Sequence, residues 1–496
     1  MNNHSALHPQ SAPRRRAGIL LHPTSLPGAD QSGDLGAAAF RFVDFLSAAG
    51  MRVWQMLPLG PTHADGSPYQ CLSIHAGNPA LISLERLQQW GWLAAVDVSR
   101  AHTDPDHRQT SLRNAHQGYL QQVTPQESTA FAQFLLKHAH WLDDYALYQA
   151  LRQEHAGQSW WAWPAALRDR VPRALDQARA RLATAMQQVR FEQYVFFRQW
   201  SELRHYASTH GVWLFGDMPI FVAHDSADVW AQRDYFLLDK NGQPTVVAGV
   251  PPDYFSASGQ RWGNPLYHWD RMQADGFRWW LTRVGTQLEL FDLLRIDHFR
   301  GFEAYWEIPA TETTAVHGRW VPAPGDALFQ ALQARFDPLP LVAEDLGTIT
   351  REVTALRERY ALPGMCILQF AFDGGADNPY PPHRHDRNSV VYTGTHDNDT
   401  TLSWFEGLPP EQQHRVRDYL GFPAEPMPWP LIRAALASVA DLAILPMQDV
   451  FALGAGQRMN TPGTTAGNWG WRFAWEQVDA GLAPRLRHLT QLYERG

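Results

Sequence analysis

Short apolar runs that end in polar residues recur along the chain, and helical stripes separate most of them. The runs are centred near residues 19, 55, 214, 293, 341, 367, 391 and 444. Between the first two, Phe40, Val43 and Leu46 lie on one face of a helix, and Gly50 follows as a stop signal. A strand, a helix and a second strand form a βαβ unit, which implies a parallel sheet. Eight alternating strands predict a closed (β/α)8 TIM barrel, an α/β fold, instead of an open sheet.

Two segments interrupt this alternation, one on each side of the third strand. Residues 84–210 have helical periodicity, including one run from 174 to 206, and are predicted to form a large helical insertion between strands 2 and 3. Residues 220–275 follow strand 3 and are predicted to be a second, loop-rich insertion. We therefore expect one barrel domain over residues 17–496 that carries both insertions, after an unstructured leader at residues 1–16.

The N-terminal segment imitates a secretory signal without completing one. Arg14, Arg15 and Arg16 precede an apolar run of five residues, Ala17 to Leu21. A signal peptide needs an apolar run of about 7 to 15 residues. Nowhere does an apolar run approach the roughly 18 residues of a membrane span, so we expect no membrane partner.

Composition narrows the class of protein further. The chain has 496 residues, of which 45% are apolar and 19% charged, so it can bury a large core. Its 42 basic and 50 acidic residues give a formal charge of −8, which argues against a nucleic-acid partner because such partners require a basic surface. Two cysteines, Cys71 and Cys366, are too few for a disulfide framework and fit a reducing cytoplasm.

The stretch Leu293 to Gly301 concentrates charge at the end of an apolar run. Arg295 and Asp297 are two residues apart, so on an extended chain they point to the same face. A neighbouring guanidinium keeps a carboxylate ionised, which makes Asp297 a candidate nucleophile. Taken alone, the pair fits a structural salt bridge equally well.

Polar groups at the ends of other strands favour the catalytic interpretation. In a TIM barrel the active site lies at the carboxyl ends of the strands. Three carboxyl groups, Asp297, Glu344 and Asp397, follow three different strands. Any one of them could be an ordinary loop acid, but three at matching positions indicate one site. The same ends carry three further polar residues: His22, Asp217 and His396.

These residue types fit some chemistries better than others. A phosphate site would need a glycine-rich loop, which is missing here. A metal site is the main competitor, because carboxylates and histidines are ligands, but Arg295 beside Asp297 would compete with a cation. Glycosidic chemistry needs an ionised carboxylate, a protonated carboxyl and hydroxyl-binding groups. Polar loops also supply aromatic side chains on which sugars could stack: Tyr69, Tyr254, Phe255 and Trp262.

Three motifs resemble those of the 4-alpha-glucanotransferases, the amylomaltase or disproportionating enzymes related to the alpha-amylase superfamily. The motifs are Leu294 to Gly301, Ala343 to Gly347 and Thr395 to Thr400. The resemblance continues in order from about residue 17 to 472. Further matching segments are Gly18 to Pro27, Leu57 to Pro61, Ser67 to Gln70, Gly216 to Ile220, Ala248 to Phe255, Trp262 to Tyr267, Asn460 to Gly463 and Asn468–Trp469. Cys71 departs from the pattern, which usually has a small hydroxyl residue there, and residues 1–16 match nothing.

The resemblance implies transfer of α-1,4-glucan segments with retention of configuration. Asp297 would be the nucleophile, Glu344 the acid and base, and Asp397 with His396 would stabilise the transition state. The residues implied to bind substrate are Ser67, Tyr69, Asp217, Tyr254, Phe255, Gln260, Trp262, Arg295, His298, Asp373, His396 and Asn460. Expected substrates are maltooligosaccharides, amylose or glycogen-type glucans. No cofactor or metal is expected, and the chain is expected to be a cytoplasmic monomer.

Two other functions remain open on the sequence. The first is an α-1,4-glucan hydrolase of the same superfamily, since the barrel alone does not determine transfer. The second is an inactive carbohydrate-binding protein, which the intact Asp297, Glu344 and Asp397 argue against.

The retaining mechanism carries expectations about geometry and protonation. The carboxyl groups of Asp297 and Glu344 should lie about 5 to 5.5 Å apart. Burial and a neighbouring carboxylate should raise the pKa of Glu344 toward ~6, while Arg295 should lower that of Asp297. The segment 246–264, with its prolines, glycines and aromatic residues, is predicted to be a lid that excludes water from the cleft.

Overall fold

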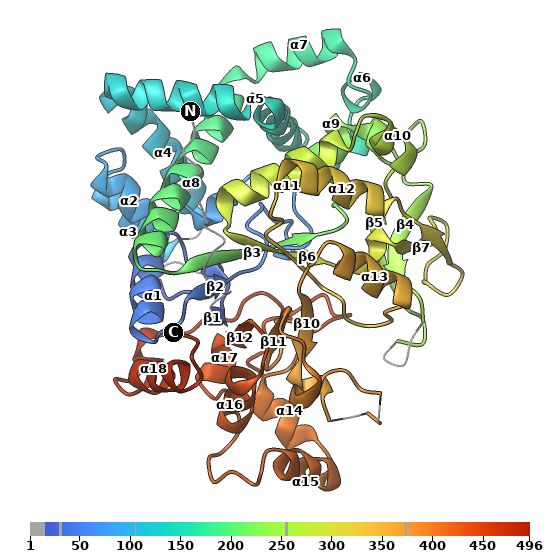
Figure 1. Cartoon of the computed structure of the whole chain (residues 1–496). Helices are drawn as coiled ribbons and strands as arrows, with labels where there is room; N and C mark the ends of the chain where they lie inside the picture. Colours follow the sequence, from blue (N-terminus) through green and yellow to red (C-terminus); the bar gives the residue numbers. More distant parts are fainter. Residues whose placement is uncertain (1–14, 29–31, 105, 253–255, 373, 376) are drawn as a thin grey trace.

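The computed structural model describes residues 15–28, 32–104, 106–252, 256–372, 374–375 and 377–496. Eight parallel strands form its centre in the order β10-β11-β12-β1-β2-β3-β6-β9 (Figure 1). They are β1 Arg16–Leu20, β2 Val53–Gln55, β3 Trp213–Pro219, β6 Leu293–Asp297, β9 Leu341–Ala343, β10 Gly364–Ile367, β11 Ser389–Tyr392 and β12 Leu442–Pro446. Each coincides with one of the predicted apolar runs, so the predicted barrel is confirmed.

Apolar side chains fill the barrel and a second layer packs outside it. Inside, Val53, Phe215, Val342 and Ile444 are at most 1% exposed, so the barrel is a packed core and not a pore. The helices that surround the strands are α1 Ala37–Ala48, α8 Ala183–Thr209, α11 Arg278–Leu290, α12 Gly325–Arg335, α13 Arg351–Arg359, α14 Thr401–Gly407, α15 Pro410–Tyr419, α16 Trp429–Ala437, α17 Met447–Val450 and α18 Leu482–Leu492.

The barrel closes between β9 and β10 through a side chain. Along the described strands these two form no regular ladder, and one backbone bond joins them, from Ala343 N to Pro363 O at 2.9 Å. The Asp345 carboxylate accepts a second bond, from Met365 N at 2.7 Å, and pairs with Arg357 Nε at 3.2 Å. The seam therefore depends on the residue directly after Glu344.

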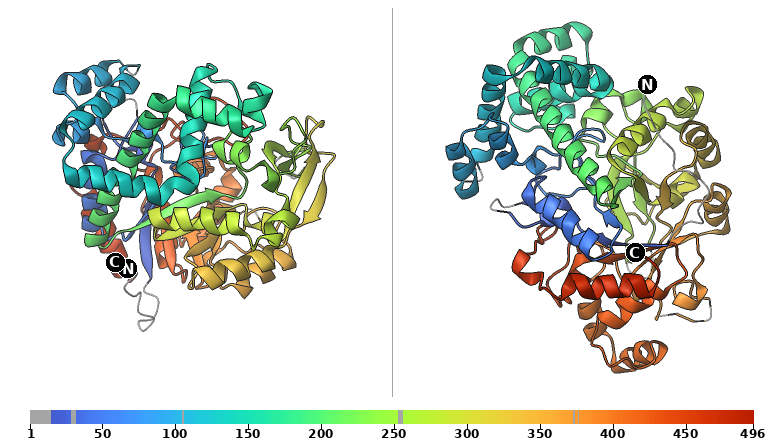
Figure 2. Two further views of the ribbon diagram at one scale, coloured as in Figure 1. Left: turned by 90° about the horizontal axis from the view of Figure 1, so that it is seen from above. Right: turned by 60° about the vertical axis from the view of Figure 1, so that its left-hand side comes forward.

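The predicted helical insertion is helical in the structure. It contains α2 Leu84–Gln89, α3 Ala95–Thr103, α4 His107–Gln122, α5 Pro125–Glu154, α6 Ala165–Arg168 and α7 Pro172–Arg181, and it ends with α8. The helix predicted from 174 to 206 is in fact two helices, because Leu182 leaves the helical conformation between α7 and α8 (ψ 14°). The second half of α8 returns to the barrel, where Trp200 donates to the backbone of Leu290 at 3.0 Å. Figure 2 (right) shows the insertion at one end of the molecule and the orange and red C-terminal helices at the other.

The segment after β3, which the sequence predicts to be loop-rich, contains short helices and strands as well as loops. Besides α9 Ala227–Ala231 and α10 Trp269–Ala274, it contains β4 Val246–Val250 and β5 Gln260–Pro265. These strands join β7 Ala304–Pro309 and β8 Arg319–Pro322 in an antiparallel sheet of order β5-β4-β7-β8, which we call the small sheet. Figure 1 shows it at the edge of the barrel. The strands of the small sheet were not predicted, because the partner strand β7 lies beyond β6 and local periodicity carries no signal for such distant pairing.

The predicted leader also extends too far. Arg16 is the first residue of β1, opposite Leu442, and its guanidinium lies 3.7 Å from the centre of the Trp213 ring. Arg15 donates to the backbone of Tyr493 at 3.0 Å. Both arginines are thus part of the barrel, and residues 1–14 lie outside the described residues. Within the described ranges, none of the helices has the length and apolarity needed to cross a membrane.

The contact between β9 and β10 leaves no room for a side chain at position 364, which can be tested by substituting Gly364. A Cβ atom there would overlap the Asp345 carboxylate, so Gly364→Ala should lower the free energy of unfolding by about 1 to 3 kcal/mol. Chemical denaturation measures this. The matched control is Gly285→Ala in α11, where the nearest atom, Phe336 Cζ, is 3.5 Å away and alanine should stabilise by up to about 1 kcal/mol. Equal effects of the two substitutions would contradict the role of the seam.

Candidate active site

One guanidinium joins two carboxylates at the mouth of the barrel. β3 and β6 pair with Asp217 opposite Arg295. Arg295 Nη1 lies 2.9 and 2.7 Å from the two oxygens of Asp217, and Nη2 lies 2.9 Å from Asp297 Oδ1. The side chains of Arg295 and Asp217 are 5% and 0% exposed, whereas that of Asp297 is 30% exposed. The cation and one anion are therefore buried, and Asp297 reaches the open end.

The pKa of Asp297 corrects a sequence-based expectation. It is raised above its ordinary value, not lowered. Desolvation is the largest cause, and the negative charges of Asp217 and Asp397 add to it. Arg295 opposes the shift, but its charge is shared with the buried Asp217. The sequence placed Arg295 beside Asp297 but could not show that a second carboxylate, Asp217, shares the charge of Arg295.

Glu344 follows β9 and is fixed by the turn that follows β6. Its Oε2 accepts a hydrogen bond from His298 N at 2.6 Å, and its Oε1 accepts one from Leu346 N at 3.1 Å. The Glu344 backbone also bonds to both sides of this turn, donating to Ile296 O at 3.0 Å and accepting from Phe299 N at 3.1 Å. His298 has a left-handed backbone (φ 56°), which begins the turn between β6 and the 3-10 helix that follows it.

Burial raises the pKa of Glu344 to about 7, and the charge of Asp297 contributes to the rise. Arg295 and the two backbone N–H groups act in the opposite direction. The direction predicted from the sequence is confirmed. The site thus contains a carboxyl that retains its proton near neutral pH beside one bound to a guanidinium, which is the arrangement of an acid and a nucleophile.

Asp397 lies after β11 and is held in the charged form. His396 Nε2 is 3.3 Å from Asp397 Oδ2, and Asn460 Nδ2 donates to Oδ1 at 2.6 Å. Although burial opposes it, His396 and Asn460 hold the pKa of Asp397 well below its usual range. Burial lowers the pKa of His396, but attraction to Asp397 outweighs this and raises it. Arg458 Nη2 donates to the backbone of Asp397 at 2.7 Å.

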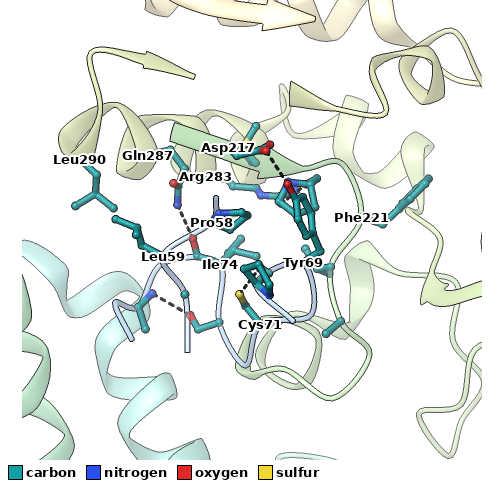
Figure 3. A pocket seen from close by; sticks show the side chains of 18 residues that line it. Pro58, Leu59, Tyr69, Cys71, Ile74, Asp217, Phe221, Arg283, Gln287 and Leu290 are labelled. Atoms are coloured by element: carbon teal, nitrogen blue, oxygen red, sulfur yellow. Dashed lines mark hydrogen bonds between the residues drawn. The ribbon is translucent and has the colours of Figure 1, made fainter. Parts of the chain in front are cut away.

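Tyr69 forms one wall of the site. Its hydroxyl donates to Asp217 Oδ2 at 2.8 Å, and its ring stacks on His396 with centroids 5.2 Å apart and an interplanar angle of 14°. Burial raises its pKa, so the phenol stays neutral. Tyr69 and Asp217 also line a cavity of about 40 Å³ (Figure 3). Cys71 lies there as a neutral thiol, because burial raises its pKa to about 12.

The small sheet contacts the turn that follows Asp297, which contains His298 and which we call the nucleophile turn. The rings of Trp262 and His298 meet edge to face at 4.8 Å, and Trp262 Nε1 donates to Gln260 Oε1 at 3.1 Å. Burial lowers the pKa of His298 to about 3, so its ring is neutral. Among the described residues its Nε2 is a buried atom without a hydrogen-bond partner.

Of the remaining residues predicted to bind substrate, one lies within the described part of the chain and three lie outside it. Ser67 lies beside Tyr69, whose backbone N–H donates to its hydroxyl at 3.4 Å. Tyr254, Phe255 and Asp373 lie outside the described residues.

Sequence reasoning missed two supports of the site. The first is Arg458, two residues before the recognised segment at Asn460, because nothing in the local sequence links it to Asp397. The second is Gln55 on β2, whose side chain accepts a bond from Tyr392 OH at 2.9 Å in the barrel. In the part of the chain that the structure describes, no three His, Cys, Asp or Glu residues are grouped to hold a metal ion.

Comparisons with known proteins match nearly the whole chain. A family model described as 4-alpha-glucanotransferase matches residues 21–477. The 4-alpha-glucanotransferase of Thermus thermophilus is 50% identical over 97% of this chain and 99% of its own length. The 4-alpha-glucanotransferase of Synechocystis is 48% identical over 97% of this chain and 98% of its own length. The solved amylomaltase from Streptococcus agalactiae in complex with acarbose has a TM-score of 0.94 and 36% identity, covering 97% of this chain and all of its own.

The electrostatics of the site predict how Glu344 titrates. By ¹³C NMR of labelled carboxyl groups, Glu344 should have a pKa of about 7, and Glu344→Gln identifies its signal by removing it. Replacing Asp297 with Asn removes a negative charge that raises this pKa, so the value should fall toward that of an ordinary glutamate. An unchanged pKa in the Asp297→Asn protein would show that the two carboxyls do not interact.

Proposed function

Since the chain belongs to the 4-alpha-glucanotransferase family, glycoside hydrolase family 77, we propose that it moves α-1,4-glucan segments by retaining double displacement. The donor is a maltooligosaccharide or amylose, and the acceptor is another glucan or glucose. The observation that carries this proposal is the pairing of Asp297, bound to Arg295, with Glu344, whose pKa is about 7. Retaining glycosidases need one nucleophilic carboxylate and one proton donor.

In the first step Asp297 attacks the anomeric carbon of the donor. Arg295 binds its Oδ1, so Oδ2 is the oxygen that forms the new bond. The bond from the anomeric carbon to the glycosidic oxygen breaks, and Glu344 gives its proton to that oxygen. A covalent glucosyl-Asp297 and a shortened glucan result.

In the second step Glu344 changes from acid to base. Esterified Asp297 has no charge, so one cause of the raised pKa of Glu344 disappears. Glu344 is then more readily ionised and takes the proton from the acceptor hydroxyl. The acceptor oxygen attacks the anomeric carbon, the bond to Asp297 breaks, and the original configuration is restored.

The other residues of the site bind and orient the sugar. Ionised Asp397 accepts hydrogen bonds from sugar hydroxyls and stabilises positive charge on the ring in the transition state. Tyr69 offers a ring beside the sugar, and Asp217 keeps Arg295 in place. We also assign substrate contacts to Ser67, Gln260, Trp262, His298, His396 and Asn460 and, from the sequence, to Tyr254, Phe255 and Asp373.

The small sheet is the proposed reason for transfer instead of hydrolysis. Water and an acceptor sugar compete for the same intermediate. A well-aligned acceptor can have an effective molarity of about 10⁵ M or more, provided that the site holds it. Trp262 contacts His298, the residue directly after Asp297, and donates to Gln260, so these two side chains are suited to holding that acceptor. We further propose, from the sequence, a cytoplasmic monomer without a cofactor.

Incubation with maltotriose tests the proposed reaction, and the activated donor α-maltotriosyl fluoride tests the roles of Glu344 and Asp297. The wild-type enzyme should give glucose and a ladder of longer glucans. Glu344→Gln should lower this activity by about 10²- to 10⁴-fold. With α-maltotriosyl fluoride, whose fluoride leaves without a proton, the same variant should form an adduct on Asp297 that mass spectrometry of peptides detects.

Other outcomes identify the alternatives. Glucose and maltose without longer products indicate a hydrolase, and unchanged maltotriose indicates a binding protein. An adduct on a residue other than Asp297 would refute the assigned nucleophile.

Trp262→Ala should raise the ratio of hydrolysis to transfer. The indole contacts His298 at the edge of the site, so its loss admits water and loosens the acceptor. The ratio of donor hydrolysed to glucan transferred is measured on maltotriose. Trp262→Phe keeps an aromatic ring and serves as the control. If transfer and hydrolysis fall together at the wild-type ratio, Trp262 binds substrate without excluding water.

A further inference from the structure

Arg300 is a buried cation with no part in the reaction described above. It lies three residues after Asp297, in the 3-10 helix η5 Phe299–Phe302, and is 5% exposed. Within the described residues no carboxylate forms an ion pair with its guanidinium. Burial lowers the pKa of Arg300, and the charge of Glu303 acts in the opposite direction. Burying a charge without a counter-ion is costly, so other contacts must compensate.

Two contacts of Arg300 join segments that are far apart in the sequence. Its Nη1 donates to the backbone carbonyl of Thr348, four residues after Glu344. Its guanidinium lies 3.7 Å from the centre of the Trp320 ring, on β8 of the small sheet. Arg300 therefore connects the nucleophile turn, the loop after the acid and the small sheet.

The loop after Glu344 is held near its start by the contacts of Asp345 and near its end by the packing of Ile349 against the core, and Arg300 binds it between these points. It runs from Asp345 to Thr350, where the Thr350 hydroxyl caps α13. Gly347 has a left-handed backbone (φ 81°), and a Cβ atom there would meet nothing within 4 Å. Near its start, Leu346 N donates to Glu344 Oε1 at 3.1 Å. Thr348 is thus the point at which Arg300 can fix a loop that helps to hold the carboxyl of the acid.

Trp320 connects Arg300 to the strand of the small sheet that carries Trp262. Trp320 is paired across the strands with Trp306, and their rings lie 5.2 Å apart. Trp306 lies opposite Gly249 on β4, and Gly249 in turn lies opposite Arg261, between Gln260 and Trp262 on β5. Strand pairing from β5 through β4 and β7 to β8 thus links Gln260 and Trp262, the residues proposed to hold the acceptor, to the contact between Trp320 and Arg300.

We propose that Arg300 is a positioning residue that couples the small sheet to Glu344 through the Thr348 carbonyl. This inference rests on the proposed role of Glu344 as acid and base. Without Arg300 the loop moves, and Leu346 N–H no longer holds the carboxyl in place. Because that N–H bond lowers the pKa of Glu344, its loss should raise the pKa and displace the proton from the glycosidic oxygen.

The test compares maltotriose with α-maltotriosyl fluoride in Arg300→Met. With maltotriose, kcat should fall by about 10- to 100-fold, the cost of a misplaced catalytic group, while KM changes little. The alkaline limb of the pH profile should move to higher pH. With the fluoride, which needs no proton, the rate of adduct formation on Asp297 should equal that of the wild type. An equal loss with both donors would overturn the proposal, because it would mean that Arg300 acts on Asp297 or on folding.

Three further variants keep the result interpretable. Trp320→Leu leaves Arg300 in place and should give the same donor-dependent defect in milder form, and combining it with Arg300→Met should add nothing. Arg300→Lys keeps the charge and serves if the Met variant does not fold. Arg319→Met makes the same substitution one residue from Trp320, at a side chain that is 76% exposed, and should behave as the wild type. Because Arg319 also pairs with Glu307 of the small sheet, the result that counts against the coupling is the absence of a defect in Trp320→Leu.

Failure of this inference can be told apart from failure of the proposed function. If the fluoride restores adduct formation in Glu344→Gln but not in Arg300→Met, only the role of Arg300 is wrong. If it restores neither variant and the wild type makes no longer glucans, the proposed function is wrong.

Discussion

The guanidinium of Arg295, shared between Asp217 and Asp297, is the interaction on which the site depends. Two carboxylates and one cation at a barrel mouth leave one negative charge in excess. Asp217 is fully buried and takes two hydrogen bonds from Arg295, so Asp297 receives only part of the compensation. Arg295 thereby holds Asp297 in place while the pKa of Asp297 stays raised, and the negative charge of Asp297 contributes to the raised pKa of Glu344.

The position of Glu344 depends on contacts made around it. Its carboxyl is held by the backbone of the turn after β6, and the next residue, Asp345, closes the barrel seam to β10. The loop beyond is fastened by Arg300, which also supports the small sheet. Barrel closure, the placement of Glu344 and the placement of the small sheet are therefore parts of one connected structure, in which a change at one part reaches the others through direct contacts.

Several features follow from the sequence because their physics is local. Each barrel strand is a short apolar run, and several of them carry polar residues at or just after their carboxyl ends, where the active site of a TIM barrel lies. Asp217, Asp297, Glu344 and Asp397 could be assigned to one end of the barrel for that reason. Features that depend on distant partners were missed. The small sheet pairs segments on both sides of β6, and Arg16 belongs to β1 because β12 lies opposite it.

The sequence by itself determined the eight strands, the helical insertion, the family and the residues at the strand ends, because periodicity and motif spacing are written along the chain. Tertiary structure alone decided the charge balance. Whether Arg295 lowers the pKa of Asp297 depends on how many carboxylates surround it and how much water reaches them, and folding brings Asp217 and Asp397 from other strands to the same point. Electrostatic energy depends on distance and solvent exposure in space, and a linear order of residues specifies neither.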